Sequence, residues 1–291
     1  MVEMVNEDIN LDHEKYIVAF LDILGFKSHV KSYLHPKVDS DKEILNKMKS
    51  ALEEAFNTQY IPAFQKTGLI IKYKQFSDCT CFAIPDFDGH LKADSLTLCG
   101  FLHMLRSFNY SMLRFGLYLR GGLSCGFHYE DENMIFSEGL IKAYELESKS
   151  VYPRIIIDNE LVKRFKELWK HQDTKETLSF YGVDKMLVSD WDGVVFMNPF
   201  SWSQSLEKML SDKPMEIPSF FDDTKDLKTN LIETDAETHS AVLQNLENEI
   251  EKLKSDENND NVLRKYIWLK ELVKWNIDPD KSKIQFEYFL K

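Results

Sequence analysis

Hydrophobic and polar positions along the chain predict strands and helices in mixed order. The segment Tyr16–Leu21 (YIVAFL) is almost entirely apolar, which is typical of a buried central strand. Residues 40–62 instead carry apolar side chains at the spacing of an amphipathic helix. Two β-prone segments, Leu69–Phe76 and Cys79–Ile84, then predict a hairpin whose turn lies at residues 77–78.

The pattern continues in the same way to about residue 200. In chain order it predicts a helix at 91–115, a strand at Leu117–Phe127, a helix at 138–148, a strand at Arg154–Asp158, a helix at 159–170 and a hairpin at Lys185–Ser189 and Val194–Asn198. This order is not a strict alternation, so we expect an α/β (α+β) sandwich with a mixed sheet.

The last third of the chain has a different pattern. Residues 235–255 and 260–276 read as two amphipathic helices. We therefore expect a main domain over residues 1–200 and a C-terminal helical extension over residues 201–291.

Composition and charge narrow the classes of partner. The 291 residues carry a formal net charge of −12, which repels nucleic-acid backbones and anionic lipids. We expect neither nucleic acid nor a membrane as the main partner. The sequence shows no signal-peptide pattern and no apolar run of about 20 residues, so we expect a cytoplasmic protein. The four cysteines lack paired zinc-site spacing and are read as reduced thiols.

Two aspartates stand where predicted strands end. Asp22 closes the first strand, and Asp78 lies in the turn of the first hairpin. If the strands are neighbours, the two carboxylates meet and offer the oxygen ligands that Mg²⁺ and Mn²⁺ prefer. From spacing alone, ordinary turn residues are the more common explanation. The loop after Asp22 offers backbone amides to phosphate oxygens, at Ile23, Leu24, Gly25 and Phe26.

Three motifs, in this order, resemble those of class III adenylate and guanylate cyclases. They are YIVAFLDILGF, KQFSDCTCFAI and LRGGLSCG, and the resemblance covers about residues 16–150. It implies a ferredoxin-like βαββαβ core and a head-to-tail homodimer with interfacial sites. It also implies two metal ions, Mn²⁺ or Mg²⁺, bound by Asp22 and Asp78, with the second ion touching the Ile23 carbonyl.

One stretch departs from that family. Ala143 and Glu147 stand where class III cyclases carry an Asn and an Arg that stabilise the transition state. The segments FLDILGF, FSD, LRGG and GLIKAYELE followed by YPRIIID resemble the divergent bacterial cyclases of the Pycsar anti-phage system. This resemblance implies a pyrimidine nucleotide cyclase that forms cyclic UMP or cyclic CMP from UTP or CTP. The alternatives are an adenylate or guanylate cyclase, or an inert cyclase-like domain that senses nucleotides.

Further site residues follow from the same motifs. Arg120 is expected to contact the triphosphate, although a surface arginine at a strand edge explains it equally well. Lys74 or its neighbour Tyr73 is expected to contact the base, and strand alternation allows only one of them to face the site. A solvated lysine and a core tyrosine are the alternative. The candidates to replace the missing Arg are Lys142, Lys149 and Arg154.

Overall fold

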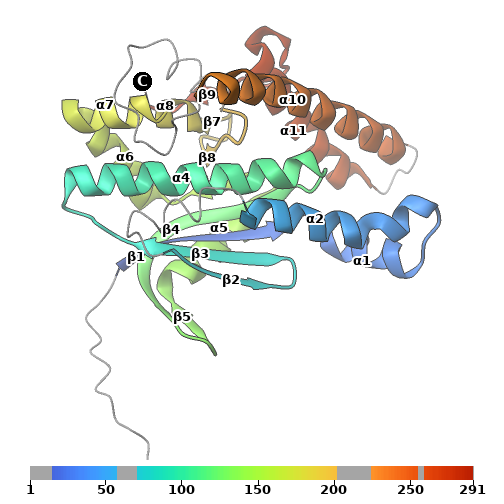
Figure 1. Ribbon diagram of the computed structural model, residues 1–291, viewed down its shortest axis with the longest axis horizontal. Coiled ribbons are helices and arrows are strands. Elements are labelled where there is room, and N and C mark those ends of the chain that lie inside the picture. Colours follow the sequence, from blue (N-terminus) through green and yellow to red (C-terminus); the bar gives the residue numbers. More distant parts are fainter. Residues whose placement is uncertain (1–14, 58–70, 202–223, 255–258, 291) are drawn as a thin grey trace, which may run out of the picture.

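Figure 1 shows the computed structural model of the chain, which describes residues 15–57, 71–201, 224–254 and 259–290. Four strands form the first half of its sheet: β1 (Lys15–Ile23), β2 (Lys72–Phe76), β3 (Cys79–Pro85) and β4 (Leu119–Glu130). They lie in the order β2-β3-β1-β4, and every neighbouring pair among them is antiparallel. With helices after β1 and after β3, this is the predicted ferredoxin-like βαββαβ core.

Helices cover one face of this half of the sheet. They are α2 (Ile44–Asn57) and α4 (Leu91–Arg114), and the preceding α1 (Phe26–Leu34) and 3₁₀ helix η1 (Asp39–Glu43) pack beside α2. The predicted helix 40–62 corresponds to η1 and α2, and its residues 58–62 lie outside the described residues, as do residues 69–70 of the predicted hairpin. Helix α1 was not predicted, although Phe26, Val30, Tyr33 and Leu34 stand at helical spacing; none of its side chains is buried.

The sheet continues beyond β4 as β6, β8, β7 and β9. These strands are β6 (Ile155–Ile157), β7 (Leu187–Ser189), β8 (Val195–Met197) and β9 (Glu287–Tyr288), and β5 (Ile135–Ser137) pairs with the end of β4. The β4–β6 pair is parallel, so the sheet is mixed, as predicted. The remaining helices of this half are α5 (Glu138–Lys149), α6 (Asn159–Lys170), α7 (Gln172–Phe180) and α8 (Val183–Met186).

The glycines of β4 allow helix α5 to approach the sheet closely. A Cβ atom at Gly122 would lie 2.2 Å from the carbonyl oxygen of Ala143, and one at Gly126 would lie 2.9 Å from the Gly139 nitrogen. Neither gap could hold a larger residue without moving α5. These glycines therefore accommodate a second backbone, and α5 lies directly over the strand that carries Arg120.

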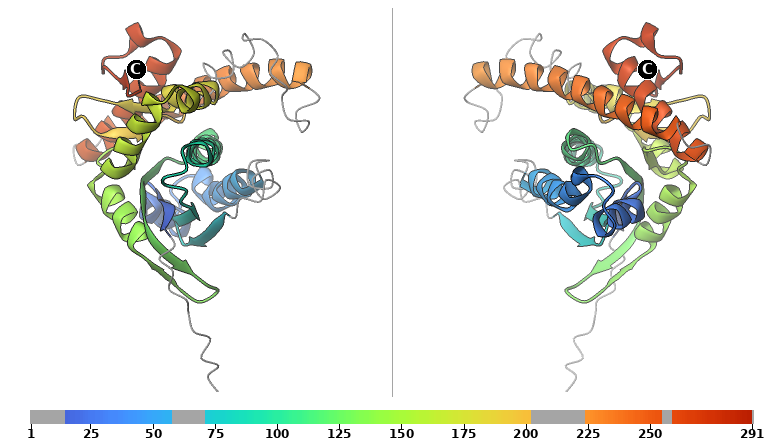
Figure 2. Two further views of the ribbon diagram at one scale, coloured as in Figure 1. Left: turned by 90° about the vertical axis from the view of Figure 1, so that its left-hand side faces the viewer. Right: turned by 90° about the vertical axis from the view of Figure 1, so that its right-hand side faces the viewer.

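Two C-terminal helices, α10 (Thr224–Lys254) and α11 (Asp260–Ile277), lie at the end of the sheet opposite the β4–β5 hairpin (Figures 1 and 2). The predicted helix 260–276 is confirmed, whereas α10 begins 11 residues earlier than its predicted start at residue 235. Trp268 of α11 is buried in a second core with Leu24, Val188 and Phe196. The helical extension thus shares a core with the loop that follows Asp22. In the described part of the chain, no helix is both long and apolar enough to span a bilayer.

Candidate metal and nucleotide site

The strand register brings three chemically active residues to one point of the sheet. On the central strand β1, Asp22 pairs with Cys79 of β3 on one side and with Arg120 of β4 on the other. The Ile23 amide donates a hydrogen bond of 3.2 Å to the Asp78 carbonyl, which fastens the β2–β3 turn to the end of β1. The backbone alone therefore fixes which side chains meet here.

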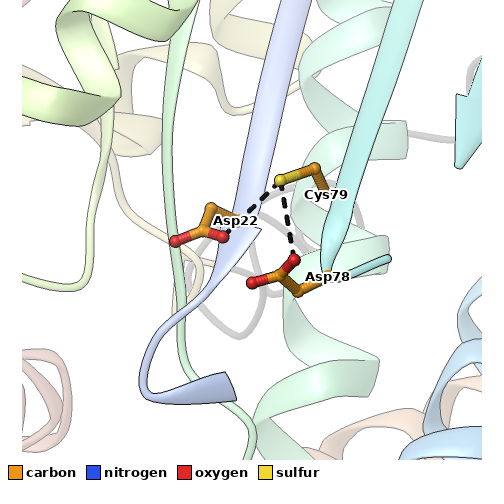
Figure 3. A group of neighbouring side chains, drawn as sticks. All are labelled: Asp22, Asp78 and Cys79. Carbon is orange, nitrogen blue, oxygen red and sulfur yellow. Dashed lines mark hydrogen bonds between the residues drawn. The ribbon is translucent and has the colours of Figure 1, made fainter. Parts of the chain in front are cut away.

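Asp22, Asp78 and Cys79 form a cluster suited to a cation. One ligand atom from each lies within 4.8 Å of the other two. The Cys79 thiol lies between the carboxylates, at 3.6 Å from Asp22 Oδ1 and 4.0 Å from Asp78 Oδ1 (Figure 3). The two carboxylates present hard oxygen ligands, so they fit Mg²⁺ or Mn²⁺, while the thiol donates weak hydrogen bonds to both of them.

Ser77 shapes the turn that carries Asp78. Its φ is 57°, in the left-handed region, as the first central residue of a tight primed hairpin turn requires. Strand β2 ends at Phe76 and β3 begins at Cys79, so the turn has only two central residues. A turn this short holds the Asp78 backbone close to the β1 terminus.

Arg120 joins Asp22 to an acid on helix α5. Its Nη2 lies 3.1 Å from Asp22 Oδ2 and 2.6 Å from Glu147 Oε1. The side chains of Asp22 and Arg120 are 16% and 23% exposed, and that of Glu147 only 6%. Because ion pairs strengthen as water is excluded, this bridge holds Arg120 in one place beside the acid cluster.

Burial makes the ionised acids of the site unfavourable. It raises the pKa of the Asp22 carboxyl; the hydrogen bond from Arg120 opposes this shift and the charge of Asp78 adds to it. Burial also raises the pKa of Glu147, against the charge of Arg120. Burial and both aspartates raise the pKa of the Cys79 thiol to about 12. A bound cation would relieve this crowding of negative charge.

The loop after Asp22 offers fewer amides than expected. The Ile23 amide is bonded to Asp78, and the Leu24 amide donates to the Tyr118 carbonyl at 2.8 Å. This corrects the expectation that four consecutive amides face a phosphate. Gly25, with a φ of 82°, precedes helix α1, so the amides of Gly25 and Phe26 lie at a helix N-terminus, where anions are favoured.

The faces of β2 separate the two candidates for base contact. Phe76 pairs with Cys79, which itself pairs with Asp22, so Lys74, two residues earlier, lies on the face of the acid cluster. Its Nζ donates to the Asp131 carbonyl at 2.6 Å. Tyr73 lies on the other face, with its ring 5.2 Å from that of Phe56 in α2. The expectation that Tyr73 contacts substrate at this site is therefore wrong, because side chains alternate along a strand.

The candidates to replace the missing Arg are bonded elsewhere. Lys142 pairs with Glu138 at 2.9 Å, and Lys149 pairs with Glu145 at 3.9 Å on the exposed side of α5. The buried Arg154 binds Asp190 and Asp192, at 3.0 and 2.5 Å. These four ion pairs lie on α5 and at the β7–β8 turn, so none of the three cations is committed to the acid cluster.

A buried serine and histidine near α5 have a structural role. The Ser137 hydroxyl donates to the Phe127 carbonyl at 3.1 Å and accepts the Leu140 amide at 2.9 Å as the N-cap of α5. His128 Nδ1 lies 2.9 Å from the same oxygen, and its Nε2 lies 3.1 Å from Glu130. Because the hydroxyl proton is committed to a backbone carbonyl, Ser137 is not placed as a nucleophile.

Sequence reasoning missed two members of the site. Cys79 was read only as a reduced thiol, although it follows Asp78 directly, and in a two-residue hairpin beside β1 it pairs with Asp22. Lys265 of α11 was missed as well. Burial and the charge of Arg120 lower the pKa of its ammonium group, and the charge of Glu147 opposes them; no local motif marks it.

Comparisons with known proteins complete the description of the site. No protein-family model matches the chain, and no curated protein sequence matches it. Among solved structures it is similar to the catalytic core of a rhodopsin-guanylyl cyclase in complex with ATPalphaS, at 14% identity and a TM-score of 0.35, covering 63% of this chain and 93% of that one. It is also similar to the guanylyl cyclase Cya2, at 14% identity and a TM-score of 0.32, covering 63% of this chain and 90% of that one.

A third similar structure is a class III adenylyl cyclase-like ATP-binding protein from Pseudomonas aeruginosa, at 11% identity and a TM-score of 0.35. The match covers 52% of this chain and 34% of that one. Chains that superpose this loosely share at most the general course of the fold, so any function has to be supported by the site geometry of this chain itself.

Proposed function

We propose that this protein is a metal-dependent nucleotidyl cyclase, which converts a nucleoside triphosphate into a 3′,5′-cyclic monophosphate and pyrophosphate. The observation that carries the proposal is the Asp22–Asp78 pair, whose ligand atoms lie within 4.8 Å at the end of the central strand. Two Mn²⁺ or Mg²⁺ ions bound there would acidify the ribose 3′-hydroxyl and neutralise phosphate charge. The Ile23 carbonyl is a further proposed ligand.

The chain's own groups then position the triphosphate for an in-line displacement. The 3′-oxygen forms a bond to the α-phosphorus, and the bond from that phosphorus to the bridging β-oxygen breaks. The hydroxyl proton passes to water, and pyrophosphate leaves with the electron pair. Arg120 and the amides of Gly25 and Phe26 donate to phosphate oxygens, where fixed donors stabilise the developing charge.

For the base we propose a pyrimidine, so that UTP or CTP gives cyclic UMP or cyclic CMP. This rests on the resemblance of the motifs to the Pycsar cyclases, in which the product is an alarm signal of anti-phage defence. Lys74 supports a base contact, because it lies on the face of the acid cluster.

We also propose that two copies of the chain form a homodimer over this face of the sheet. Phe76 is 45% exposed, and Ile141 and Tyr144, three residues apart on α5, are 61% and 55% exposed. The rings of Phe76 and Tyr144 lie 6.4 and 5.6 Å from that of Phe20 in β1. An apolar surface beside a polar site is what a second copy would cover.

The decisive experiment supplies each of the four α-labelled ribonucleoside triphosphates to the purified protein with Mn²⁺. A cyclic pyrimidine monophosphate and an equal amount of pyrophosphate are expected. A cyclic purine product would replace the base assignment and leave the cyclase reaction in place. If none of the four is converted, the protein is not a cyclase and the nucleotide-sensing alternative gains. Sedimentation equilibrium tests the dimer, and full activity in a strictly monomeric sample would exclude interfacial sites.

A further inference from the structure

Helix α11 reaches the two segments that hold Arg120 and Glu147. The ring of Tyr266 lies 5.3 Å from that of Tyr118, which stands two residues before Arg120. The ring of Trp268 stacks on Tyr152, in the loop after α5, at 5.1 Å. Helix α11 therefore packs against Tyr118 and Tyr152, which lie close in the chain to Arg120 and Glu147.

Lys265 extends from this part of α11 and is half-buried. The charges of Arg120 and Glu147 both act on its ammonium group: burial and Arg120 lower its pKa, and Glu147 opposes them. Among the described residues no carboxylate lies within 4.0 Å of it, whereas Lys270 of the same helix pairs with Glu247 at 2.7 Å. A half-buried lysine that has no acid partner can bind an anionic ligand.

The charges around the site show why the triphosphate needs a cationic side chain in addition to Arg120 and the proposed metal ions. Arg120 is held by Asp22 and Glu147 together, at 3.1 and 2.6 Å, so much of its charge is already balanced. The two proposed divalent ions bring four positive charges, of which Asp22 and Asp78 offset two. A triphosphate carries about four negative charges, and binding it without further cations leaves part of that charge uncompensated.

We propose that Lys265 binds the triphosphate tail of the nucleotide, so that the C-terminal helices supply a phosphate ligand to the site. The inference rests on the proposed function. Glu147 stands where class III cyclases carry an arginine, and Lys265 supplies a positive charge that Glu147 does not. It assigns the extension a direct part in the chemistry, in addition to packing. Lys265 follows Asp22 by more than 240 residues in the chain.

The test measures binding of inorganic tripolyphosphate with Mn²⁺ by calorimetry, because this probe needs neither a base nor turnover. Lys265→Met is expected to weaken binding about 10- to 100-fold, the usual effect of losing a charged hydrogen bond. Arg264→Met is the matched control, since Arg264 is an exposed cation on the same turn, and it should bind as the wild type does. Lys265→Arg is expected to restore most of the affinity.

Kinetics adds a readout that a merely structural residue would not move. Lys265→Met should raise the KM for the converted nucleotide more than it lowers kcat, at an unchanged melting temperature; if that variant unfolds, Lys265→Gln takes its place. If a folded Lys265 variant binds tripolyphosphate with wild-type affinity, the inference is overturned and the cyclase proposal still stands. The same conclusion follows if the wild type forms cyclic product but does not bind tripolyphosphate. Lys265-dependent binding without any cyclic product would keep the triphosphate site and refute the cyclase.

Discussion

Arg120 Nη2 lies 3.1 Å from Asp22 Oδ2, across the pairing of β4 with β1. One carboxylate thus faces a fixed cation on one side and a second aspartate on the other. The arrangement leaves Asp22 Oδ1, which lies nearer Cys79, directed into the acid cluster. Each carboxylate oxygen of Asp22 therefore has a different partner, and substitutions at those partners should have separable effects.

Asp22→Asn and Asp78→Asn are each expected to abolish cyclic nucleotide formation, because an amide supplies no charge to a divalent ion. They should also remove any rise in melting temperature caused by Mn²⁺, since a ligand stabilises only the fold that binds it. Thermal melts with and without Mn²⁺ measure this. Asp88→Asn is the control, at an acid that is exposed. A normal Mn²⁺ shift in both site variants would remove the aspartates as ligands.

Arg120→Met is expected to lower the free energy of unfolding by about 1–3 kcal/mol at pH 7.5, because two partly buried carboxylates lose their cation. The loss should shrink near pH 5, where more of these acids are protonated. Urea unfolding at the two pH values measures it. The double variant Arg120→Met/Glu147→Gln should recover part of the loss, since it removes one of the stranded charges. A loss equal at both pH values would contradict the ionic explanation.

Glu147→Gln tests the pKa of this buried acid. The folded chain raises the pKa of Glu147 above its usual 4.5, so the folded state holds the proton more tightly than the unfolded state does. The wild type therefore loses stability as the pH rises from the unfolded pKa through the folded one. Glutamine cannot ionise, so the free energy of unfolding of the variant, relative to that of the wild type, should increase between pH 4.5 and 7.5. Urea unfolding measures this difference. Glu145→Gln, at an exposed acid of the same helix, is the control for the substitution itself.

Lys74→Met is expected to change the relative rates for the four nucleotides, because Lys74 lies on the face of the acid cluster. Tyr73→Phe should leave those rates unchanged, since its ring packs against Phe56 on the opposite face. Competition assays with mixed nucleotides measure both. Altered base preference in the Tyr73 variant alone would reverse the assignment of faces.

Gly122→Ala is expected to destabilise the fold by about 1–3 kcal/mol, the usual cost of overpacking. The new methyl group would meet the Ala143 carbonyl at 2.2 Å, so α5 and with it Glu147 must shift. Activity should fall together with stability. Gly89→Ala is the comparison: apart from its chain neighbours, no atom of the described residues lies within 4 Å of its Cβ position, and its φ of +91° opposes the change. Equal losses at both glycines would mean that crowding by α5 is unimportant.

The central sheet was predictable from sequence because its signals are local. An unbroken apolar run gives β1, and the short hairpin gives β2 and β3 around Asp78. Once β1 and β3 are neighbours, Asp22 and Asp78 must meet. The same register decides between Tyr73 and Lys74, so counting from the two-residue turn would have settled that alternative.

What the sequence did not reveal depends on contacts between distant segments. Strand β9 has two residues and exists through its pairing with β7, so no local pattern marks it. The Arg120–Glu147 bridge depends on how closely α5 packs, which the glycines of β4 decide. Lys265 reaches the site through the packing of α11 on Tyr118, and an amphipathic pattern gives the helix but not its neighbour.

The pairing of β9 with β7 bears on the order of folding. Val188 pairs with Tyr288, about 100 residues later, while β2 and β3 are joined by a two-residue turn. Closing the longer loop costs more chain entropy, and strand pairs between distant segments form slowly. We therefore expect the edge of the sheet at β7 to be completed last, after the strands that carry the aspartates have already paired.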